Sequence, residues 1–231
     1  MFDIHSHILF GVDDGCKTLS ESIEMIQKAI DSGVTDLVLT PHYALRRKYA
    51  STKDELQRRF EILKEQVQEL KLPITLYLGS EIDEDTEMFD FVTKEQCYTL
   101  NNSKYILLDF GMRKCEVDDI IYEFIVNGYK PIIAHPERYM YVTGIEKLKR
   151  WRKTGALLQM NAGSLFGSAH VKKQAKLMVK HQLVDIIASD AHRNPKSYDN
   201  LKDTYKYISK KISASYADIV SRFNPELIRG D

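Results

Sequence analysis

Two histidines lie one residue apart near the start of the chain, in the stretch FDIHSH. His5 and His7 belong to a predicted strand over residues 2–9, so their side chains leave the same face of that strand. Imidazoles that face one way can bind a divalent metal ion, or they can be hydrogen-bonded structural groups. The other ionisable residues of the sequence bear on this choice.

Imidazole or carboxylate side chains also end most of the other predicted strands. We expect these strands over residues 36–42, 74–81, 105–110, 130–136, 156–162 and 185–192, because each holds a short apolar run without clean alternation. The residues at or just beyond the strand ends are His5, His7, Asp14, His42, Glu81, Asp109, His135, Asp190 and His192. The strand over 156–162 ends at Asn161 instead.

Amphipathic helices are predicted between the strands. Capping boxes at Thr18 and Thr52 begin two of them, and helical spacing also covers roughly 117–127, 144–153, 170–181 and 198–211. Seven strand–helix repeats predict an α/β barrel rather than an open doubly wound sheet. No linker interrupts the pattern, so residues 1–231 are expected to form one domain. The carboxyl ends of barrel strands meet at one rim, where the ionisable residues should converge.

Such a concentration of ionisable groups needs a compensating positive charge, which divalent metal ions supply. The nine side chains offer nitrogen and oxygen and no thiolate, which favours manganese, iron, zinc or magnesium. They exceed the needs of one tetrahedral zinc, so two or three ions that share carboxylates are expected. His170 and His181 fall in predicted helices and are interpreted as packing or surface residues.

Composition argues against several classes of function. Lys plus Arg and Asp plus Glu number 33 each, which argues against a general nucleic-acid or membrane binder. No signal-peptide pattern or long apolar stretch opens the chain, so a cytoplasmic protein is expected. Cys16, Cys97 and Cys115 form no CxxC pair and are expected to be small buried residues. None of them begins a CxxxxxR phosphate loop.

Cationic side chains follow two of the candidate ligands. Arg138 lies three residues after His135, and a guanidinium at a multi-metal rim is able to hold a phosphoryl group in bidentate fashion. Arg138 is therefore the candidate catalytic and phosphate-binding residue. Arg46 and Arg47, followed by Lys48, are candidates for binding an acidic phosphopeptide, or they are a solvated surface.

The stretches DIHSHILFGVDDG, TPHY, GSEI, LLDFG, AHPERY and ASDAH resemble, in this order, the polymerase-and-histidinol-phosphatase (PHP) superfamily. Within it, essentially the whole chain is similar to bacterial manganese-dependent protein-tyrosine phosphatases of capsule and exopolysaccharide operons. The resemblance implies a distorted seven-stranded (β/α)7 barrel with three metal ions and with Arg138 on the phosphate. The implied ligands are His5, His7, Asp14, His42, Glu81, His135, Asp190 and His192, with Glu81 bridging. Asp109 stands where these phosphatases usually have glutamate, and it is a further candidate ligand.

The predicted reaction is metal-assisted hydrolysis of phosphotyrosine in a protein, with water as the nucleophile. The substrate implied by the resemblance is a bacterial tyrosine kinase that controls polysaccharide export. A small-molecule phosphatase acting on histidinol phosphate or a sugar phosphate is the first alternative, and it predicts a narrow, closed pocket. An amidohydrolase or lactonase needs a lysine at a strand end, where the sequence has none. A non-catalytic metal-binding module is the third alternative. The sequence gives no sign of an oligomeric state.

Overall fold

Short parallel strands alternate with helices through the computed structural model, which describes residues 1–111 and 117–229. This arrangement confirms the predicted α/β class. The strands are β1 (Phe2–Asp3), β2 (Asp36–Leu39), β3 (His42–Tyr43), β4 (Thr75–Leu78), β5 (Glu81–Asp83), β6 (Tyr105–Asp109), β7 (Lys130–Ile133), β8 (Leu157–Asn161) and β9 (Ile186–Ala188).

The strands form two parallel sheets rather than the single seven-stranded sheet that the sequence predicts. One sheet has three strands in the order β1-β2-β4, and the other has six in the order β3-β5-β6-β7-β8-β9. The difference arises because two predicted strands are each divided. Pro41, which has no amide proton to donate, separates β2 from β3, and Gly79 and Ser80 separate β4 from β5.

The first and last strands are brought together just beyond their ends. Ser6 pairs with Ala191 in a parallel bridge, the amide of His7 donates to the carbonyl of Ala191 at 2.7 Å, and the amide of Asp190 donates to the carbonyl of His5 at 2.9 Å. Residues near the two ends of the sequence therefore lie side by side.

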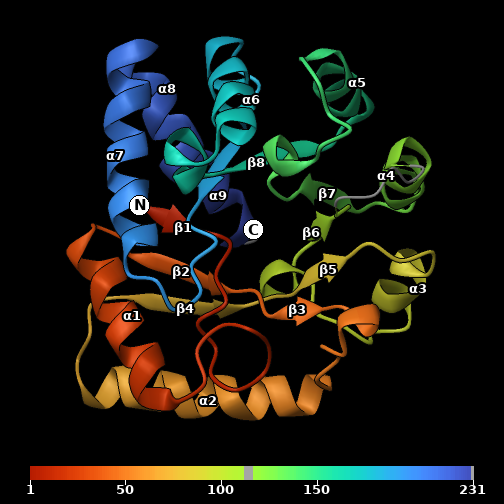
Figure 1. Ribbon diagram of the computed structural model, residues 1–231. Helices are drawn as coiled ribbons and strands as arrows, with labels where there is room; N and C mark the ends of the chain where they lie inside the picture. The colour runs from red at the N-terminus through yellow and green to blue at the C-terminus, as the bar shows by residue number, and fades with distance from the viewer. Residues whose placement is uncertain (112–116, 230–231) are drawn as a thin grey trace.

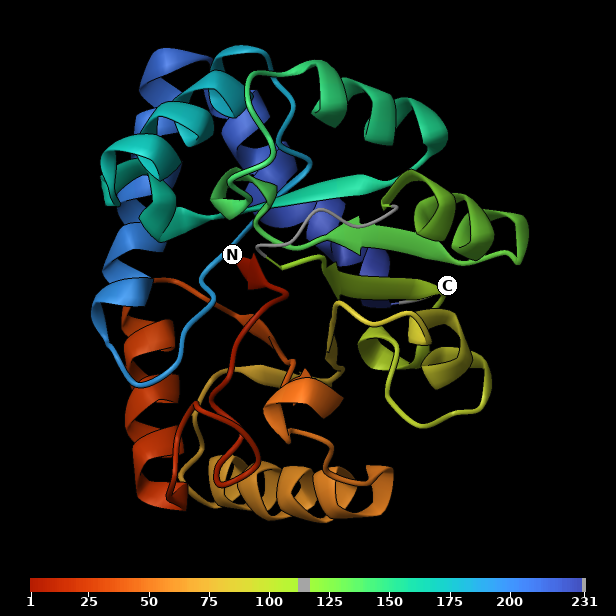
Figure 2. The same ribbon diagram turned by 45° about the vertical axis from the view of Figure 1, so that its right-hand side comes forward.

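Helices surround the strands on the outside, as Figures 1 and 2 show from two directions. They are α1 (Leu19–Asp31), α2 (Lys53–Glu69), α3 (Met88–Thr93), α4 (Val117–Val126), α5 (Glu146–Thr154), α6 (Ala169–Lys180), α7 (Lys196–Lys211), α8 (Ala214–Asp218) and α9 (Asn224–Glu226). Thr18 and Thr52 cap α1 and α2 as predicted, since their hydroxyls accept from the amides of Glu21 and Glu55. No helix in the described ranges combines the length and the apolar character needed to cross a bilayer.

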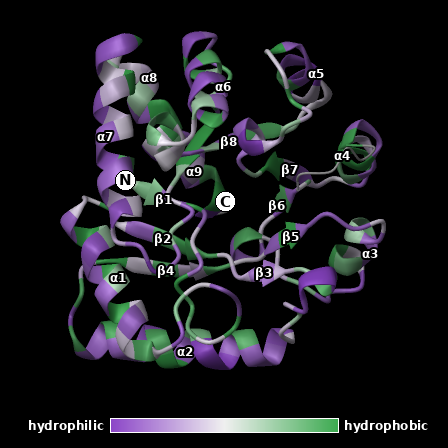
Figure 3. Cartoon of the chain, in the orientation of Figure 1, coloured by the Kyte–Doolittle hydropathy of each residue, from purple (hydrophilic) through white to green (hydrophobic). Residues whose placement is uncertain are grey.

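Two apolar clusters hold the elements in place. The larger one packs the helices against the strands, and the helices in Figure 3 accordingly carry both hydrophobic and hydrophilic residues. The smaller one gathers side chains from β1, β2, β6, β7 and β9, among them Phe2, Leu107 and Ile132. Cys16 and Cys97 are buried and free, as predicted, and Cys115 lies outside the described residues.

Candidate metal centre

The predicted ligands come together where the strands end, although they span the sequence from residue 5 to residue 192. They form five overlapping groups, and within each group the nitrogen or oxygen atoms offered lie within 4.8 Å of one another. The groups are His7, Asp14, His42 and His192; His5, His7 and Glu81; His5, His135 and Asp190; His42, Glu81 and Asp83; and Glu81, Asp109 and His135. These ten side chains, the nine predicted ones and Asp83, are called the candidate centre below.

Glu81 lies in the middle of the candidate centre, at the start of β5. Its Oε1 atom is 3.3 Å from His5 Nε2 and 3.0 Å from His135 Nε2. Its Oε2 atom is 3.2 Å from His7 Nε2 and 3.0 Å from His42 Nδ1. A buried carboxylate with an imidazole pair on each oxygen has the arrangement that a bridging ligand needs.

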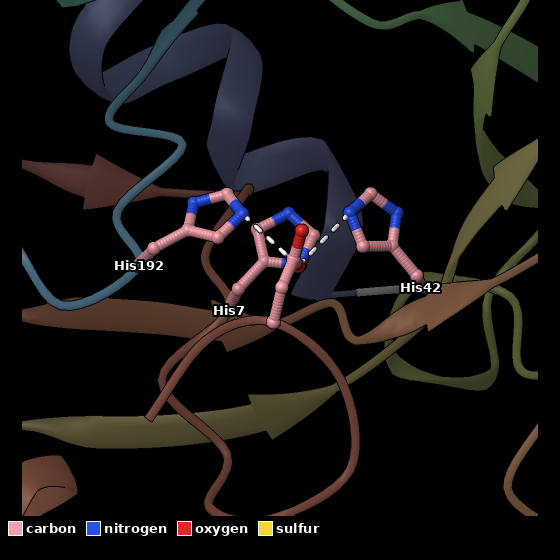
Figure 4. Close-up of side chains that lie close together, drawn as sticks. His7, His42 and His192 are labelled. Atoms are coloured by element: carbon pink, nitrogen blue, oxygen red, sulfur yellow. Dashed lines mark ion pairs between the residues drawn. The ribbon is translucent and has the colours of Figure 1, made fainter. Parts of the chain in front are cut away.

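Asp14 joins a second set of imidazoles from the loop between β1 and α1. Its Oδ1 atom lies 3.5 Å from His42 Nε2 and 3.4 Å from His192 Nε2. Figure 4 shows the rings of His7, His42 and His192 facing a shared space. The side chain of Asp14 is 38% exposed, so this part of the candidate centre is open to solvent.

Two oxygens of the candidate centre indicate that its residues fit metal ions. Asp14 Oδ1 and Glu81 Oε2 are buried atoms that accept no hydrogen bond, although imidazole nitrogens lie 3.0–3.5 Å away. Close approach without hydrogen-bond geometry indicates that oxygen and nitrogen atoms are directed at common points between them. The donors are imidazoles and carboxylates, the ligand types of hard and borderline divalent ions.

Electrostatics inside the candidate centre reflects the need for positive charge. Burial alone would raise the pKa of Glu81, but the neighbouring His5 and His42 rings hold it well below its usual range. Burial opposes the charging of His135, yet Asp109 and Glu81 raise the pKa of His135 to about 9. The imidazoles thus favour the charged form of Glu81, and the carboxylates favour the charged form of His135.

Asp13 and Gln159 orient the imidazoles and were not identified from the sequence. His7 Nδ1 lies 2.8 Å from Asp13 Oδ2, and His5 Nδ1 lies 3.0 Å from Gln159 Oε1. Partners of this kind fix the tautomer and the direction of a metal-binding ring. The signals were weak: Asp13 merely precedes Asp14, and Gln159 precedes Asn161 by two residues on the same face of β8.

Asp83 is a candidate ligand that sequence reasoning also missed. Its Oδ1 atom is 2.9 Å from His42 Nδ1, and its backbone lies two residues beyond Glu81 in β5. The period of two in a strand places both side chains on one face, which is the signal that would have identified it.

The predicted cationic residues divide into two sets. Arg138 Nη1 lies 2.9 Å from Asp190 Oδ2, with its side chain 48% exposed at the edge of the candidate centre. Arg47 Nη2 lies 2.7 Å from Asp14 Oδ2. Arg46 instead faces Asp85, with Nε 3.9 Å from the nearer carboxylate oxygen, and no ion pair of the described residues joins it to the candidate centre.

Backbone strain coincides with two of the candidate ligands. His135 has φ 32° and ψ 52°, and Asp190 has φ 50°, so both residues adopt the left-handed conformation that side chains disfavour. Strain of this kind persists where the surroundings enforce it, which is common at functional sites. Here the amide of His135 donates to Gln159 Oε1, and the amide of Asp190 donates to the carbonyl of His5.

Cys16 lies close to the candidate centre but lacks the properties of a nucleophile. Its sulfur is 3.5 Å from the carbonyl of His192, and burial raises the pKa of its thiol to about 12. The reactive form of cysteine is the thiolate, which is scarce at neutral pH for such a group.

Known proteins are similar to this sequence over nearly its whole length. The family described as capsular polysaccharide synthesis, CpsB/CapC, matches residues 1–229. CapC from Staphylococcus aureus is 34% identical over 226 residues, which cover 96% of this chain and 88% of the relative. The tyrosine-protein phosphatase CpsB from Streptococcus pneumoniae is 30% identical over 240 residues, which cover 99% and 98%.

Solved structures share the fold as well. The match to the crystal structures of YwqE from Bacillus subtilis and CpsB from Streptococcus pneumoniae, described as metal-dependent tyrosine phosphatases, has a TM-score of 0.87 at 28% identity and covers 99% and 94% of the two chains. Histidinol phosphate phosphatase from Lactococcus lactis has a TM-score of 0.53 at 14% identity, covers 89% and 93%, and shares the fold alone. The sequence and the structure agree, and this chain belongs to the CpsB/CapC family of capsular polysaccharide synthesis.

Proposed function

We propose that this protein is a metal-dependent phosphatase that hydrolyses phosphotyrosine in protein substrates. The observation that carries the proposal is Glu81, a buried carboxylate contacted by four imidazoles within 3.3 Å, beside a rim that bears the half-exposed Arg138. The relatives named tyrosine-protein phosphatases and their metal-dependent structures support the same reaction.

The ten side chains of the candidate centre would hold two or three divalent ions, with manganese as the proposed metal. When bound, such ions supply the positive charge that polarises a phosphoryl group and makes a nearby water more acidic. Asp13 and Gln159 orient the His7 and His5 rings for this task. Asp109 is shorter than the usual glutamate, yet it lies within reach of Glu81 and His135.

Arg138 would bind the phosphoryl group from the side that faces solvent. Its guanidinium is anchored on Asp190 and offers further N–H donors, which neutralise charge on the phosphoryl oxygens as the transition state forms. Water forms the new bond to phosphorus while the bond to the tyrosine oxygen breaks. The phenolate, whose conjugate acid has a pKa of about 10, leaves without a dedicated general acid and then takes up a proton.

The surroundings of the candidate centre favour a protein substrate over a small one. A hollow of about 230 Å³ borders Arg138 and is lined by polar residues such as Asn161, Ser164 and Asn200. Another, of about 200 Å³, borders Arg47, Asp83 and Asp109. Two open hollows beside one centre leave room for residues that flank a phosphotyrosine in a protein chain, whereas a histidinol phosphate site would be closed.

Three further proposals concern the protein as a whole. The substrate would be a bacterial tyrosine kinase, consistent with a family of capsular polysaccharide synthesis. The chain would form one domain, because a single apolar cluster includes residues from Ile8 to Val220. The two sheets would together be a distorted seven-stranded barrel, joined by the bridge between Ser6 and Ala191. The cytoplasmic location stays a prediction.

A direct comparison of substrates tests the proposed function. With Mn²⁺ present, the protein should release phosphate from a phosphotyrosine peptide far faster than from histidinol phosphate. His7→Ala should abolish this release and keep the far-UV circular dichroism of the parent, whereas His181→Ala, on an exposed residue at the end of α6, should keep full activity. No peptide turnover with Mn²⁺, or faster turnover of histidinol phosphate, would refute the proposal.

A further inference from the structure

Arg47 contacts three side chains of the candidate centre, which is more than binding a substrate at the rim requires. It ends the short 3₁₀ helix Leu45–Arg47 that follows β3. Its Nη2 atom lies 2.7 Å from Asp14 Oδ2, while Nη1 lies 3.3 Å from Asp83 Oδ2 and 3.2 Å from His42 Nε2. All three partners belong to groups that offer ligand atoms to a metal ion.

The contact with His42 uses an atom that a metal ion would need. His42 Nδ1 faces two acceptors, Asp83 Oδ1 at 2.9 Å and Glu81 Oε2 at 3.0 Å, which favour the tautomer with a proton on Nδ1. In that tautomer Nε2 carries the lone pair, and Arg47 Nη1, which can only donate, lies 3.2 Å from it. The same Nε2 lies 3.5 Å from Asp14 Oδ1 in the group formed with His7 and His192. One lone pair cannot serve a guanidinium and an ion at the same time.

We infer that Arg47 is an internal cation that compensates Asp14 and Asp83 until a divalent ion enters the group of His7, Asp14, His42 and His192 and displaces it. The inference rests on the metal dependence proposed above. It makes this group the weakest ion site of the candidate centre, because binding there must break the contacts of Arg47 with Asp14 and His42. Arg47 is thus a positioning residue that governs how fully the centre is loaded.

The surroundings of Arg47 allow the side chain to leave without disturbing the backbone. The side chain is 43% exposed, and its guanidinium lies 5.2 Å from the centre of the Tyr49 ring, which offers a cation–π contact nearby. Ala44 and Tyr49 exchange two backbone hydrogen bonds, at 2.6 and 3.0 Å, which hold the ends of the loop together. Displacement therefore requires only a change of side-chain rotamer.

Arg46 provides a matched control one residue away. It carries the same charge and comparable exposure, but its guanidinium faces Asp85 at 3.9 Å. A general effect of removing one positive charge from this loop would appear in Arg46→Ala and Arg47→Ala alike. A specific competition with the ion would appear only in Arg47→Ala.

Calorimetric titration of metal-free protein with Mn²⁺ tests the inference. The weakest ion should bind about tenfold more tightly to Arg47→Ala than to the parent, because one charged hydrogen-bonded contact no longer has to be broken. The tighter ions and all ions of Arg46→Ala should bind as in the parent. Metal-free Arg47→Ala should also melt at a lower temperature than the metal-free parent, and Mn²⁺ should raise its melting temperature by more.

Unchanged or weaker ion binding in Arg47→Ala, or an equal gain in Arg46→Ala, would overturn the inference. Arg47→Met, which keeps a long aliphatic side chain without the guanidinium, serves the same comparison if the alanine variant folds poorly. Neither readout depends on hydrolysis. Failure of the parent to cleave a phosphotyrosine peptide would therefore count against the proposed function alone.

Discussion

At the scale of single residues, several imidazoles of the candidate centre are held through their second ring nitrogen. Asp13 holds His7, Gln159 holds His5, and the carbonyl of Asp190 lies 3.1 Å from His192 Nδ1. These contacts set the direction of each ring before any ion binds. Binding of an ion therefore requires little rearrangement of these rings, which favours affinity.

Replacement of Asp13 by asparagine tests this preorganisation. Asp13→Asn keeps the shape of the side chain but removes its charge and one acceptor, because Oδ2 contacts both His7 Nδ1 and the amide of His42 while Oδ1 accepts from the amide of Gly15. Mn²⁺ affinity and turnover should fall about 10–100-fold. Titration with Mn²⁺ and phosphopeptide assays measure the effect. The control is Asp118→Asn, which changes a surface aspartate paired with Arg150. Parent-like affinity in Asp13→Asn would contradict this account.

The residues of the candidate centre differed in how readily the sequence revealed them. All nine predicted ligands were recognisable because each stands at or just beyond the end of an apolar run. Asp83 was missed because β5 continues two residues past the predicted strand end at residue 81, and Gln159 was missed because it lies inside β8. The direction of Arg47 was not predictable either, since it belongs to a loop whose side-chain directions no periodicity sets.

At the scale of elements, the loop between β1 and α1 brings two aspartates beside His7. The amide of Gly11 donates to the carbonyl of Cys16 at 2.7 Å, and the amide of Cys16 donates to the carbonyl of His7 at 3.1 Å. Gly15 lies against the backbone of His7, where a Cβ atom on residue 15 would be 1.6 Å from the His7 oxygen. Only glycine fits at this point of the loop.

Gly15→Ala should displace the loop and with it the carboxylates of Asp13 and Asp14. We expect a loss of stability of about 1–3 kcal/mol, as for other overpacked sites, together with weakened Mn²⁺ binding. Gly167→Ala is the control, because its added Cβ would meet nothing closer than 3.6 Å. Thermal melting and Mn²⁺ titration compare the two, and equal tolerance of both variants would show that the loop adapts.

Elements with strong patterns were predicted well, and those with weak patterns were not. The capped helices α1 and α2 begin where Thr18 and Thr52 indicated. The division of two strands escaped prediction, because Pro41 and Gly79 lie inside otherwise continuous runs. The helix α3 was missed because six residues are too few to show a helical period.

At the scale of the whole molecule, the apolar core and the candidate centre are separate sources of stability. The larger apolar cluster involves strands and helices on every side and contains none of the ten side chains of the centre. Removal of metal ions should therefore leave the fold in place while charge repulsion in the centre grows.

Treatment with a chelator should abolish turnover, keep the far-UV circular dichroism and lower the melting temperature. Addition of Mn²⁺ should restore both activity and melting temperature, because ions that bind only the folded state stabilise it. Calorimetry and circular dichroism provide the measurements. Unfolding on chelation would instead indicate a structural centre and support a metal-binding module over an enzyme.

The bridge between Ser6 and Ala191 has a consequence for how the protein is made. His5 and His7 leave the ribosome early, whereas Asp190 and His192 leave it only after most of the chain has been synthesised. Until then, the two ligand groups that include Asp190 or His192 are incomplete. Full loading of the candidate centre is accordingly a late event in the biogenesis of this protein, because these two groups draw on ions available to an almost finished polypeptide.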